Sequence, residues 1–327
     1  MSADPPFAET DGPEDGSSGS DGLSRRRFLG TLAIAAGAAS IGTTFPPAHR
    51  RMTETIRELA EKHGNDPSLL IDLTKCVGCG ACVMACKLDN HLEWREDQPA
   101  KGPDAALASS NWSVVQAEGR VGRDGESRYV KRQCMHCLEP SCASACFVKA
   151  LRKSPEGPVL YDGNLCVGCR YCLMACPFSV PTFEWDKTFG RVDKCDFCFA
   201  RTSKGEPSAC AQACPVGAIT FGHRASMLEE AWRRIGAEPQ KYVPHVYGET
   251  EVGGTSMLYL SDVSFEKLGF RTGLPTDPIP SYEWKITRLI PSVAAGLGGT
   301  LVALYVRRRR LILEEEDAAR TDEEVTA

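Results

Sequence analysis

Apolar residues are unevenly spread along the chain, and their distribution separates two ends from a central region. An apolar stretch without a charged residue, 289–306, lies near the C-terminus. A run of small apolar residues, 31–45, lies near the N-terminus. Residues 1–23 before it are rich in Gly, Ser, Pro and acidic residues and contain no Lys or Arg. Because so few apolar side chains cannot offset the entropy lost on ordering, we predict a disordered acidic leader over 1–23.

The C-terminal apolar segment predicts a transmembrane helix over 286–306. Its 21 residues would span about 31 Å as a helix, close to the thickness of the bilayer hydrocarbon core. Four arginines, 307–310, follow directly, so the positive-inside rule predicts a cytoplasmic tail 307–327 and an exterior domain. Aromatic residues lie at both ends of the segment, as at membrane interfaces: Tyr282, Trp284 and Tyr305. Its small residues indicate either a packing face for another membrane helix or chance composition: Gly296, Gly298 and Gly299.

The central region shows short apolar runs typical of an α+β domain. Segments 157–161 and 217–221 predict short strands, and 225–235 has a helical pattern. Segments 88–129 and 177–192 are mostly polar or aromatic inserts. We treat 224–283 as a C-terminal extension of the domain.

Composition narrows the function. The net charge of −5 argues against a nucleic-acid-binding protein, which normally carries a basic excess. A hydrophobic content of 42% is sufficient for a globular core. The unusual feature is the 16 cysteines, a number that indicates disulfides or bound metal according to their spacing.

All the cysteines lie between positions 76 and 214, in four groups of four. The first group has the spacing C-x2-C-x2-C-x3-C and consists of Cys76, Cys79, Cys82 and Cys86. The second has two extra residues before its third member and consists of Cys134, Cys137, Cys142 and Cys146. The third repeats the first spacing with Cys166, Cys169, Cys172 and Cys176. The fourth has eleven residues between its middle members and consists of Cys195, Cys198, Cys210 and Cys214.

The first and third spacings are those of bacterial ferredoxins with [4Fe–4S] clusters. Three closely spaced thiolates hold one cluster, and the fourth cysteine ligates the other cluster of a pair. Gly78, Gly80 and Gly168 allow the backbone to approach the cluster and present N–H groups to it. We therefore predict that all sixteen cysteines bind iron, in four [4Fe–4S] clusters held by two fused bacterial-ferredoxin-like units over 66–223.

Other cysteine chemistry fits this pattern less well. Zinc sites use paired C-x-x-C motifs without a third thiolate three residues further on. Disulfides do not require the repeat, and no C-x-x-C-H motif for covalent haem is present. We find no nucleophile–base set, phosphate-binding loop or paired carboxylates, and we predict no catalytic site in this chain.

Several polar residues beside the cysteines are candidates for tuning cluster potentials. Positively charged side chains near a cluster favour its reduced state. Four such residues lie beside cysteines in the sequence, and each could equally be an ordinary surface residue: Lys75, Lys87, Arg170 and Lys194. His136 either donates a hydrogen bond to a sulfide or lies at a partner interface. The other histidines form no spaced cluster and are expected to be structural: His49, His63, His91, His223 and His245.

The segment 24–48 resembles a twin-arginine export signal. Arg25 and Arg26 precede a Phe-Leu pair and the small apolar run. Cleavage near Ala48 and retention as an anchor both remain open. Twin-arginine signals carry proteins that are already folded, which suits a protein whose clusters are inserted in the cytoplasm.

Export signal, four cysteine groups and C-terminal anchor together resemble the iron–sulfur subunits of exported membrane oxidoreductases. Two families share this plan: the β subunit of formate dehydrogenase and the four-cluster electron-transfer subunit of hydrogenase-2-type [NiFe] hydrogenases. The likeness is closer to the hydrogenase subunit and rests on Lys-Arg-Gln-Cys-Met-His-Cys at 131–137, Cys-Val-Gly-Cys-Arg-Tyr-Cys at 166–172, Tyr-Gly-Glu at 247–249 and Glu-Val-Gly-Gly-Thr at 251–255. Phe147 departs from it, because a proline often follows the fourth cysteine of this group.

The resemblance implies a relay on the periplasmic face of the cytoplasmic membrane. Electrons would pass from a hydrogenase small subunit, or from a molybdopterin subunit in the formate dehydrogenase alternative, to an integral membrane subunit that reduces quinone. The resemblance also favours nested cluster pairing. Its four ligand sets are Cys76, Cys79, Cys82 with Cys214; Cys195, Cys198, Cys210 with Cys86; Cys134, Cys137, Cys142 with Cys176; and Cys166, Cys169, Cys172 with Cys146. Spacing alone leaves the pairing of neighbouring groups equally open.

Overall fold

The computed structural model describes residues 57–123 and 125–326, with side chains described as far as residue 315. The predicted acidic leader 1–23 and the twin-arginine segment 24–48 lie outside the described residues.

A three-stranded sheet joins segments that are distant in the sequence. Its strand order is β10-β1-β9, with β1 at Pro67–Asp72, β9 at Ile219–His223 and β10 at Met257–Leu260. Strand β1 pairs antiparallel with β9 and parallel with β10. The sheet therefore links the start of the cysteine-rich region, its end and the C-terminal extension.

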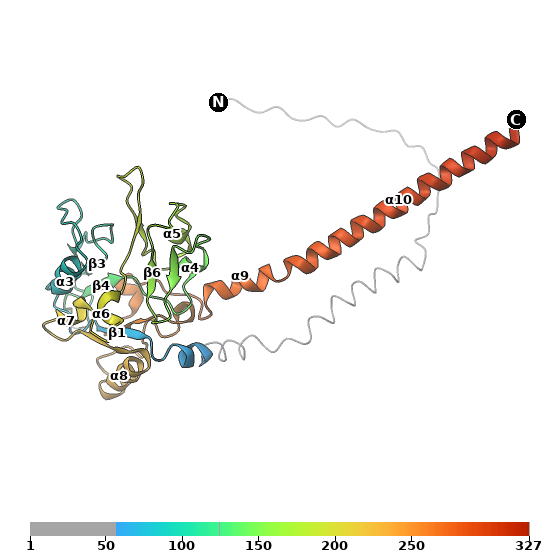
Figure 1. Ribbon diagram of the computed structural model, residues 1–327. Helices are drawn as coiled ribbons and strands as arrows, with labels where there is room; N and C mark the ends of the chain where they lie inside the picture. The colour runs from blue at the N-terminus through green and yellow to red at the C-terminus, as the bar shows by residue number, and fades with distance from the viewer. Residues whose placement is uncertain (1–56, 124, 327) are drawn as a thin grey trace, which may run out of the picture. The chain divides into compact units, whose positions relative to one another are not determined.

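The central strand β1 is buried on both faces. Leu69 and Ile71 belong to the main core, whereas Leu70 packs into a second core beneath helix α8. Helix α8, Arg224–Ala237, buries Met227 and other residues at helical spacing on one face, and it contacts β1 (Figure 1). The helix predicted over 225–235 is therefore confirmed. A strand buried on both faces shows no polar alternation, which is why the sequence pattern gave β1 little prominence.

A second sheet lies within and after the segment 88–129, where the sequence indicated only an insert. Its order is β2-β3-β4, formed by Lys101–Gly102, Ser113–Ala117 and Tyr129–Gln133. The fully buried side chains of Val114, Val115 and Val130 hold it in the core. Strands β3 and β4 are antiparallel, and β4 ends directly before Cys134.

Two short hairpins and several short helices complete the cysteine-rich region. The hairpins are β5–β6, Leu151–Lys153 with Val159–Tyr161, and β7–β8, Thr182–Phe183 with Val192–Asp193. Strands β6 and β9 confirm the strands predicted near 157–161 and 217–221, with shifted ends. Each short helix contains or directly follows a cysteine: α3 Ala81–Asp89, α4 Ser141–Ser144, α5 Tyr171–Ala175, α6 Phe199–Thr202 and α7 Ala209–Gln212. The extension adds the 3₁₀ helices η2, Glu251–Gly253, and η3, Phe265–Leu268.

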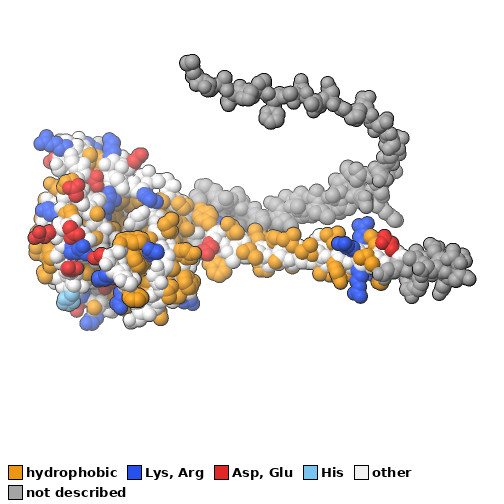
Figure 2. All heavy atoms as spheres, turned by 90° about the horizontal axis from the view of Figure 1, so that it is seen from above, with side chains coloured by type: hydrophobic (Ala, Val, Ile, Leu, Met, Phe, Trp, Pro, Cys, Tyr) orange, Lys and Arg blue, Asp and Glu red, His pale blue; other side chains and the backbone are white. Residues whose placement is uncertain are grey.

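The C-terminal part is helical. Helix α9, Ile279–Thr287, is followed by a two-residue turn and then by helix α10, Ile290–Thr326. Within the described residues, one helical segment, Ile279–Glu315, has the length and apolar composition needed to cross a membrane. Figure 2 shows hydrophobic side chains along this helix and then a group of basic ones. Helix α10 begins at Ile290 rather than at the predicted residue 286, with Pro291 in its first turn, where proline is favoured.

Candidate iron–sulfur cluster sites

The first cysteine group lies in the loop after β1 and on helix α3. Cys82 and Cys86 are one helical turn apart on α3, and both are buried. Gly78 and Gly80 in the preceding loop have φ values of 67° and 82°, in the left-handed region that glycine adopts without strain. A Cβ atom on Gly78 would also lie 2.4 Å from the Tyr129 ring. The loop conformation and the close approach of Tyr129 therefore both require glycine.

The same backbone conformation recurs in all four groups. The residue two positions after the first cysteine has a φ of 67° in Gly78, 46° in His136, 70° in Gly168 and 68° in Phe197. The N–H groups of Gly168 and Phe197 donate to the sulfurs of Cys166 and Cys195, at 3.4 and 3.3 Å. The glycines at two of these positions were visible in the sequence. His136 and Phe197 were not recognisable as their counterparts, because neither residue type favours positive φ.

The fourth cysteines also accept hydrogen bonds. Ala218 N donates to Cys214 Sγ at 3.2 Å, and Leu151 N donates to Cys146 Sγ at 3.5 Å. The side-chain amide of Asn90 lies 3.7 Å from Cys86 Sγ. Donors of this kind stabilise thiolates and the clusters that thiolates hold.

Strand pairing brings the two outermost cysteine groups together. Strand β1 leads into the first group and β9 follows the fourth, and the two strands pair antiparallel with Ile71 opposite Ile219. Cys76 and Cys214 therefore lie beyond the same end of this strand pair. One cavity is lined by Ile71 and Ile219 and by four thiols from these two groups: Cys76, Cys79, Cys82 and Cys214.

The hairpin β5–β6 brings the two inner cysteine groups, the second and the third, together. Strand β5 follows Cys146 and β6 precedes Cys166, with Leu151 opposite Tyr161. Both cysteines thus lie beyond one end of the hairpin. Burial raises the pKa of Cys172 to about 11, and the nearby charges of Cys166 and Cys146 act in the same direction.

Electrostatic coupling identifies the other neighbouring thiols. Burial raises the pKa of Cys86 to about 12; the charge of Lys131 lowers it, and the charges of Cys210 and Cys198 raise it. Burial also raises the pKa of Cys137 well above its ordinary value, with contributions from three further thiols: Cys142, Cys134 and Cys176. Thiols from groups that are distant in the sequence are therefore within electrostatic reach of each other.

The cysteine thiols are available as metal ligands. All sixteen cysteines are free thiols. In the part of the chain that the structure describes, no three His, Cys, Asp or Glu side chains are arranged to hold a single metal ion. Thiolates around one zinc ion lie close together, because each is about 2.3 Å from the metal. A [4Fe–4S] cluster is held by four thiolates, and the four thiols around one cavity, Cys76, Cys79, Cys82 and Cys214, provide that donor set.

The four cations predicted near the cysteines have different environments. Lys87 and Lys194 are buried, and their amines donate to backbone carbonyls, at 2.8 Å to Glu93 O and 2.9 Å to Cys195 O respectively. Lys75 lies 3.9 Å from the Asp72 carboxylate. The guanidinium of Arg170 lies 4.9 Å from the centre of the exposed Trp185 ring. Lys87 and Lys194 thus place their charge inside the protein.

His136 is completely buried beside two cysteine groups. Its Nδ1 accepts a hydrogen bond from Val159 N at 3.0 Å, so the ring hydrogen lies on Nε2. No described residue accepts a hydrogen bond from that Nε2 atom. Burial lowers the pKa of His136 well below its ordinary value, and nearby lysines act in the same direction. A neutral ring with a free N–H fits the predicted role as a hydrogen-bond donor to cluster sulfur.

Of the other described histidines, His91 lies just beyond the C-terminal end of α3, and the remaining three contact oxygen atoms of other residues. His63 pairs with Asp66 at 2.9 Å, and His245 with Glu251 at 2.8 Å. His223 Nδ1 lies 2.8 Å from Asn65 O. These contacts agree with the structural role expected of them; His49 lies outside the described residues.

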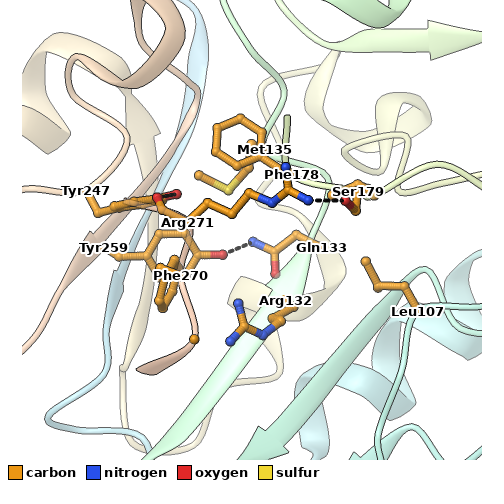
Figure 3. A pocket seen from close by; sticks show the side chains of 12 residues that line it. Leu107, Arg132, Gln133, Met135, Phe178, Ser179, Tyr247, Tyr259, Phe270 and Arg271 are labelled. Carbon is orange, nitrogen blue, oxygen red and sulfur yellow. Dashed lines mark hydrogen bonds between the residues drawn. The ribbon is translucent and has the colours of Figure 1, made fainter. Parts of the chain in front are cut away.

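A separate cavity of about 160 Å³ lies beside strand β4 (Figure 3). Its lining combines aromatic, amide and guanidinium side chains from β4, β10 and the segments around 178–180 and 269–271. Gln133 Nε2 donates to Tyr259 Oη at 3.1 Å, and Arg271 donates to Ser179 Oγ at 3.3 Å. Its lining residues provide no nucleophile paired with a base, so the cavity does not form a recognisable catalytic site.

Comparison with known proteins supports cluster binding. Two family models described as 4Fe-4S dicluster domain match residues 75–150 and 126–224. The chain is 38% identical to a protein of Nitratidesulfovibrio vulgaris, over 93% of this chain and 83% of the relative. It is 33% identical to the hydrogenase-2 operon protein HybA of Escherichia coli O157:H7, over 84% of this chain and 94% of the relative.

A further relative has a different catalytic partner. The iron–sulfur subunit of the nitrate-inducible formate dehydrogenase of Escherichia coli K12 is 34% identical, over 72% of this chain and 82% of the relative. The resemblance to hydrogenase-2 and formate dehydrogenase subunits that the motifs indicated is thereby confirmed.

The Gly78→Ala variant is expected to bind less iron than the parent chain. The new methyl group would collide with the Tyr129 ring and hold an unfavourable positive φ, a strain of about 1–3 kcal/mol within the first cysteine loop. Iron per chain and the thermal unfolding midpoint would be measured under anaerobic conditions.

Gly119→Ala is the matched control, because Gly119 has a φ of 70° with no atom within 4 Å of a new Cβ. Equal iron content in the two variants would contradict the role assigned to the close packing of Gly78 and Tyr129.

Proposed function

Because the chain belongs to the family of [4Fe–4S] iron–sulfur subunits that includes the hydrogenase-2 operon protein HybA and the formate dehydrogenase iron–sulfur subunit, we propose that it relays electrons from a [NiFe] hydrogenase to an integral membrane subunit that reduces quinone. When bound, each of its four clusters would take up and release one electron at a time. The chain's own contribution is to hold, shield and order these stations. It has no catalytic site of its own in this proposal.

The sixteen cysteines would hold the four clusters in nested pairs. The observation that carries this assignment is the antiparallel pairing of β1 with β9, which gathers Cys76, Cys79, Cys82 and Cys214 around one cavity. The β5–β6 hairpin supports the corresponding set of Cys166, Cys169, Cys172 and Cys146. The neighbours of Cys86 and of Cys137 support the two remaining sets. Those sets are Cys195, Cys198, Cys210 with Cys86, and Cys134, Cys137, Cys142 with Cys176.

The clusters would form one line through the domain. The first set contains the exposed Cys79, and the Cys166 set contains the exposed Cys169. The two units meet where Cys195 lies within electrostatic reach of both Cys86 and Cys134. An order with exposed clusters at the two ends and buried clusters between them allows electrons to enter at one surface and leave at another. Five of the eight thiols in the two inner sets are buried, which limits the access of water to the middle of the line.

The second ferredoxin unit would lie on the side of the membrane partner. Helix α4, which carries Cys142 and ends just before Cys146, contacts α9, and Ser144 Oγ lies 3.3 Å from a carboxylate oxygen of Glu283. Helix α9 continues through a short turn into α10, the proposed membrane anchor. The Cys166 set would therefore deliver electrons to the membrane subunit, and the Cys76 set would receive them from the hydrogenase small subunit.

A formate dehydrogenase or another molybdopterin oxidoreductase is the alternative partner. The hydrogenase-2 relative matches 84% of this chain and the formate dehydrogenase relative matches 72%. This wider match favours the hydrogenase. Isolation of the native complex distinguishes the two, since a nickel-containing partner supports the first proposal and a molybdenum-containing partner supports the second.

Cysteine replacement tests the relay and its nested pairing together. The parent chain, purified anaerobically, should contain about sixteen iron atoms and, after reduction, show the EPR signals of four interacting clusters. Cys86→Ser and Cys198→Ser should alter the same EPR signal, because both residues would hold one cluster.

Cys137→Ser serves as the comparison variant. Under neighbour pairing it would share a cluster with Cys86, so an identical change in Cys86→Ser and Cys137→Ser would overturn the nested assignment. A zinc-loaded, EPR-silent parent protein would overturn the proposed function itself.

Membrane topology gives a separate expectation. Reporter fusions after Ala327 and near Tyr282 should lie on opposite sides of the membrane, with Ala327 in the cytoplasm, because the arginines 307–310 resist translocation. Replacing Arg25 and Arg26 by lysine should retain the folded protein in the cytoplasm. Matching reporter signals at the two positions, or unchanged export of the lysine variant, would contradict this proposal.

A further inference from the structure

Lys131 is a lysine inside the cysteine-rich domain. It lies on β4 and is only 2% exposed. Side chains alternate between the two faces of a strand, so Lys131 shares a face with Tyr129 and Gln133. Tyr129 packs against Gly78 in the first cysteine loop. This face of β4 is therefore directed toward the first cysteine group.

A closed hydrogen-bond network fixes the lysine in place. Lys131 Nζ donates to Gln133 Oε1 at 2.7 Å. Gln133 Nε2 donates to Tyr259 Oη at 3.1 Å, the bond drawn in Figure 3. Tyr259 Oη donates in turn to the backbone oxygen of Lys131 at 3.0 Å. The amine is thus held in one position by a neutral amide and a neutral phenol.

Lys131 lacks an acidic partner. Among the described residues, no carboxylate lies within 4.0 Å of its Nζ atom. Lys153, another lysine in the cysteine-rich region, differs in this respect, because its amine lies 3.1 Å from the Asp66 carboxylate. A buried charge without a partner is unfavourable unless another group neutralises it. The groups that face Lys131 are cysteine thiols.

These thiols belong to two different ligand sets. Lys131 lines the cavity that contains Cys76, Cys79, Cys82 and Cys214. Burial acts to lower the pKa of Lys131, but negative charge at Cys210 and Cys82 outweighs it and raises the pKa, with a further contribution from Cys195. Cys82 belongs to the first proposed set and Cys210 to the second, and both lie in the same core as Tyr259, whose hydroxyl donates to the Lys131 backbone oxygen.

We propose that Lys131 is a fixed positive charge that raises the reduction potentials of the two clusters of the first ferredoxin unit, a statement that rests on the proposed function. Reduction adds one negative charge to a cluster, and a nearby cation stabilises that charge more strongly in a buried site than in water. Lys131 would thereby keep these two stations reducible although their thiolates are largely removed from solvent.

The test compares Lys131→Met with Lys131→Arg in the full chain, within its membrane complex. EPR-monitored redox titration should show two of the four clusters becoming harder to reduce in Lys131→Met. A tenfold change in the ratio of reduced to oxidised cluster is expected, which for a one-electron couple is 59 mV. The reduction potentials of the two clusters in the second ferredoxin unit should not change. Lys131→Arg should keep all four potentials of the parent chain, because it keeps the positive charge.

Lys153→Met is the matched control, since it removes a partly buried lysine whose charge is already paired with Asp66. This variant should leave the reduction potentials of the two clusters in the first ferredoxin unit unchanged. Lys131→Gln removes the charge but keeps a polar group next to Gln133, and it gives the same measurement if Lys131→Met binds less iron.

Three results would overturn the proposal while four clusters remain present: unchanged potentials in the uncharged variants, an equal shift of all four clusters, or the same shift in Lys131→Arg. A parent protein without clusters would instead overturn the proposed function, so the two failures are distinguishable by iron content.

Discussion

A left-handed residue two positions after the first cysteine is the local constraint on which the four cysteine groups depend. The φ values of Gly78, His136, Gly168 and Phe197 lie between 46° and 70°, and in the last two groups the N–H of this residue donates to the first cysteine sulfur. This turn allows three thiols close in sequence to surround one cluster, with backbone donors directed at sulfur. Glycine meets the requirement without strain in two groups. In the other two, burial of His136 and Phe197 in the core holds the same backbone conformation.

Long-range strand pairing then decides which distant groups meet. The antiparallel β1–β9 pair brings the first and fourth groups to one end of a sheet, and the β5–β6 hairpin brings the second and third groups together. The extension contributes β10 to the first sheet, so the domain depends on residues well beyond the last cysteine. This arrangement supports the proposed nested pairing, because one strand pair joins the first and fourth groups and another joins the second and third.

Spacing in the sequence was sufficient to predict cysteine groups of the ferredoxin type, the helix α8 and an apolar C-terminal helix, because each depends on local periodicity. It did not predict β2 and β3, since the segment 88–129 is largely polar and its few buried positions, such as Val114 and Val115, are separated by loops. The burial of Lys131 was equally invisible, because a lysine in a polar run is ordinarily solvated. Spacing also left the cluster pairing open, since only the tertiary pairing of β1 with β9 brings Cys214 to Cys76. His136 and Phe197 were missed as loop residues because their positive φ is imposed by the fold.

Four clusters in one line, held by nested cysteine sets, would place iron at defined positions in the loaded protein, and locating that iron tests the proposed arrangement. Diffraction data collected at the iron absorption edge from the anaerobic holoprotein would give the position of each cluster independently of the protein geometry. We expect four separate iron positions in one line, with Cys86 on the same cluster as Cys195, Cys198 and Cys210. Fewer than four positions, or Cys86 on the same cluster as Cys134, Cys137 and Cys142, would contradict it.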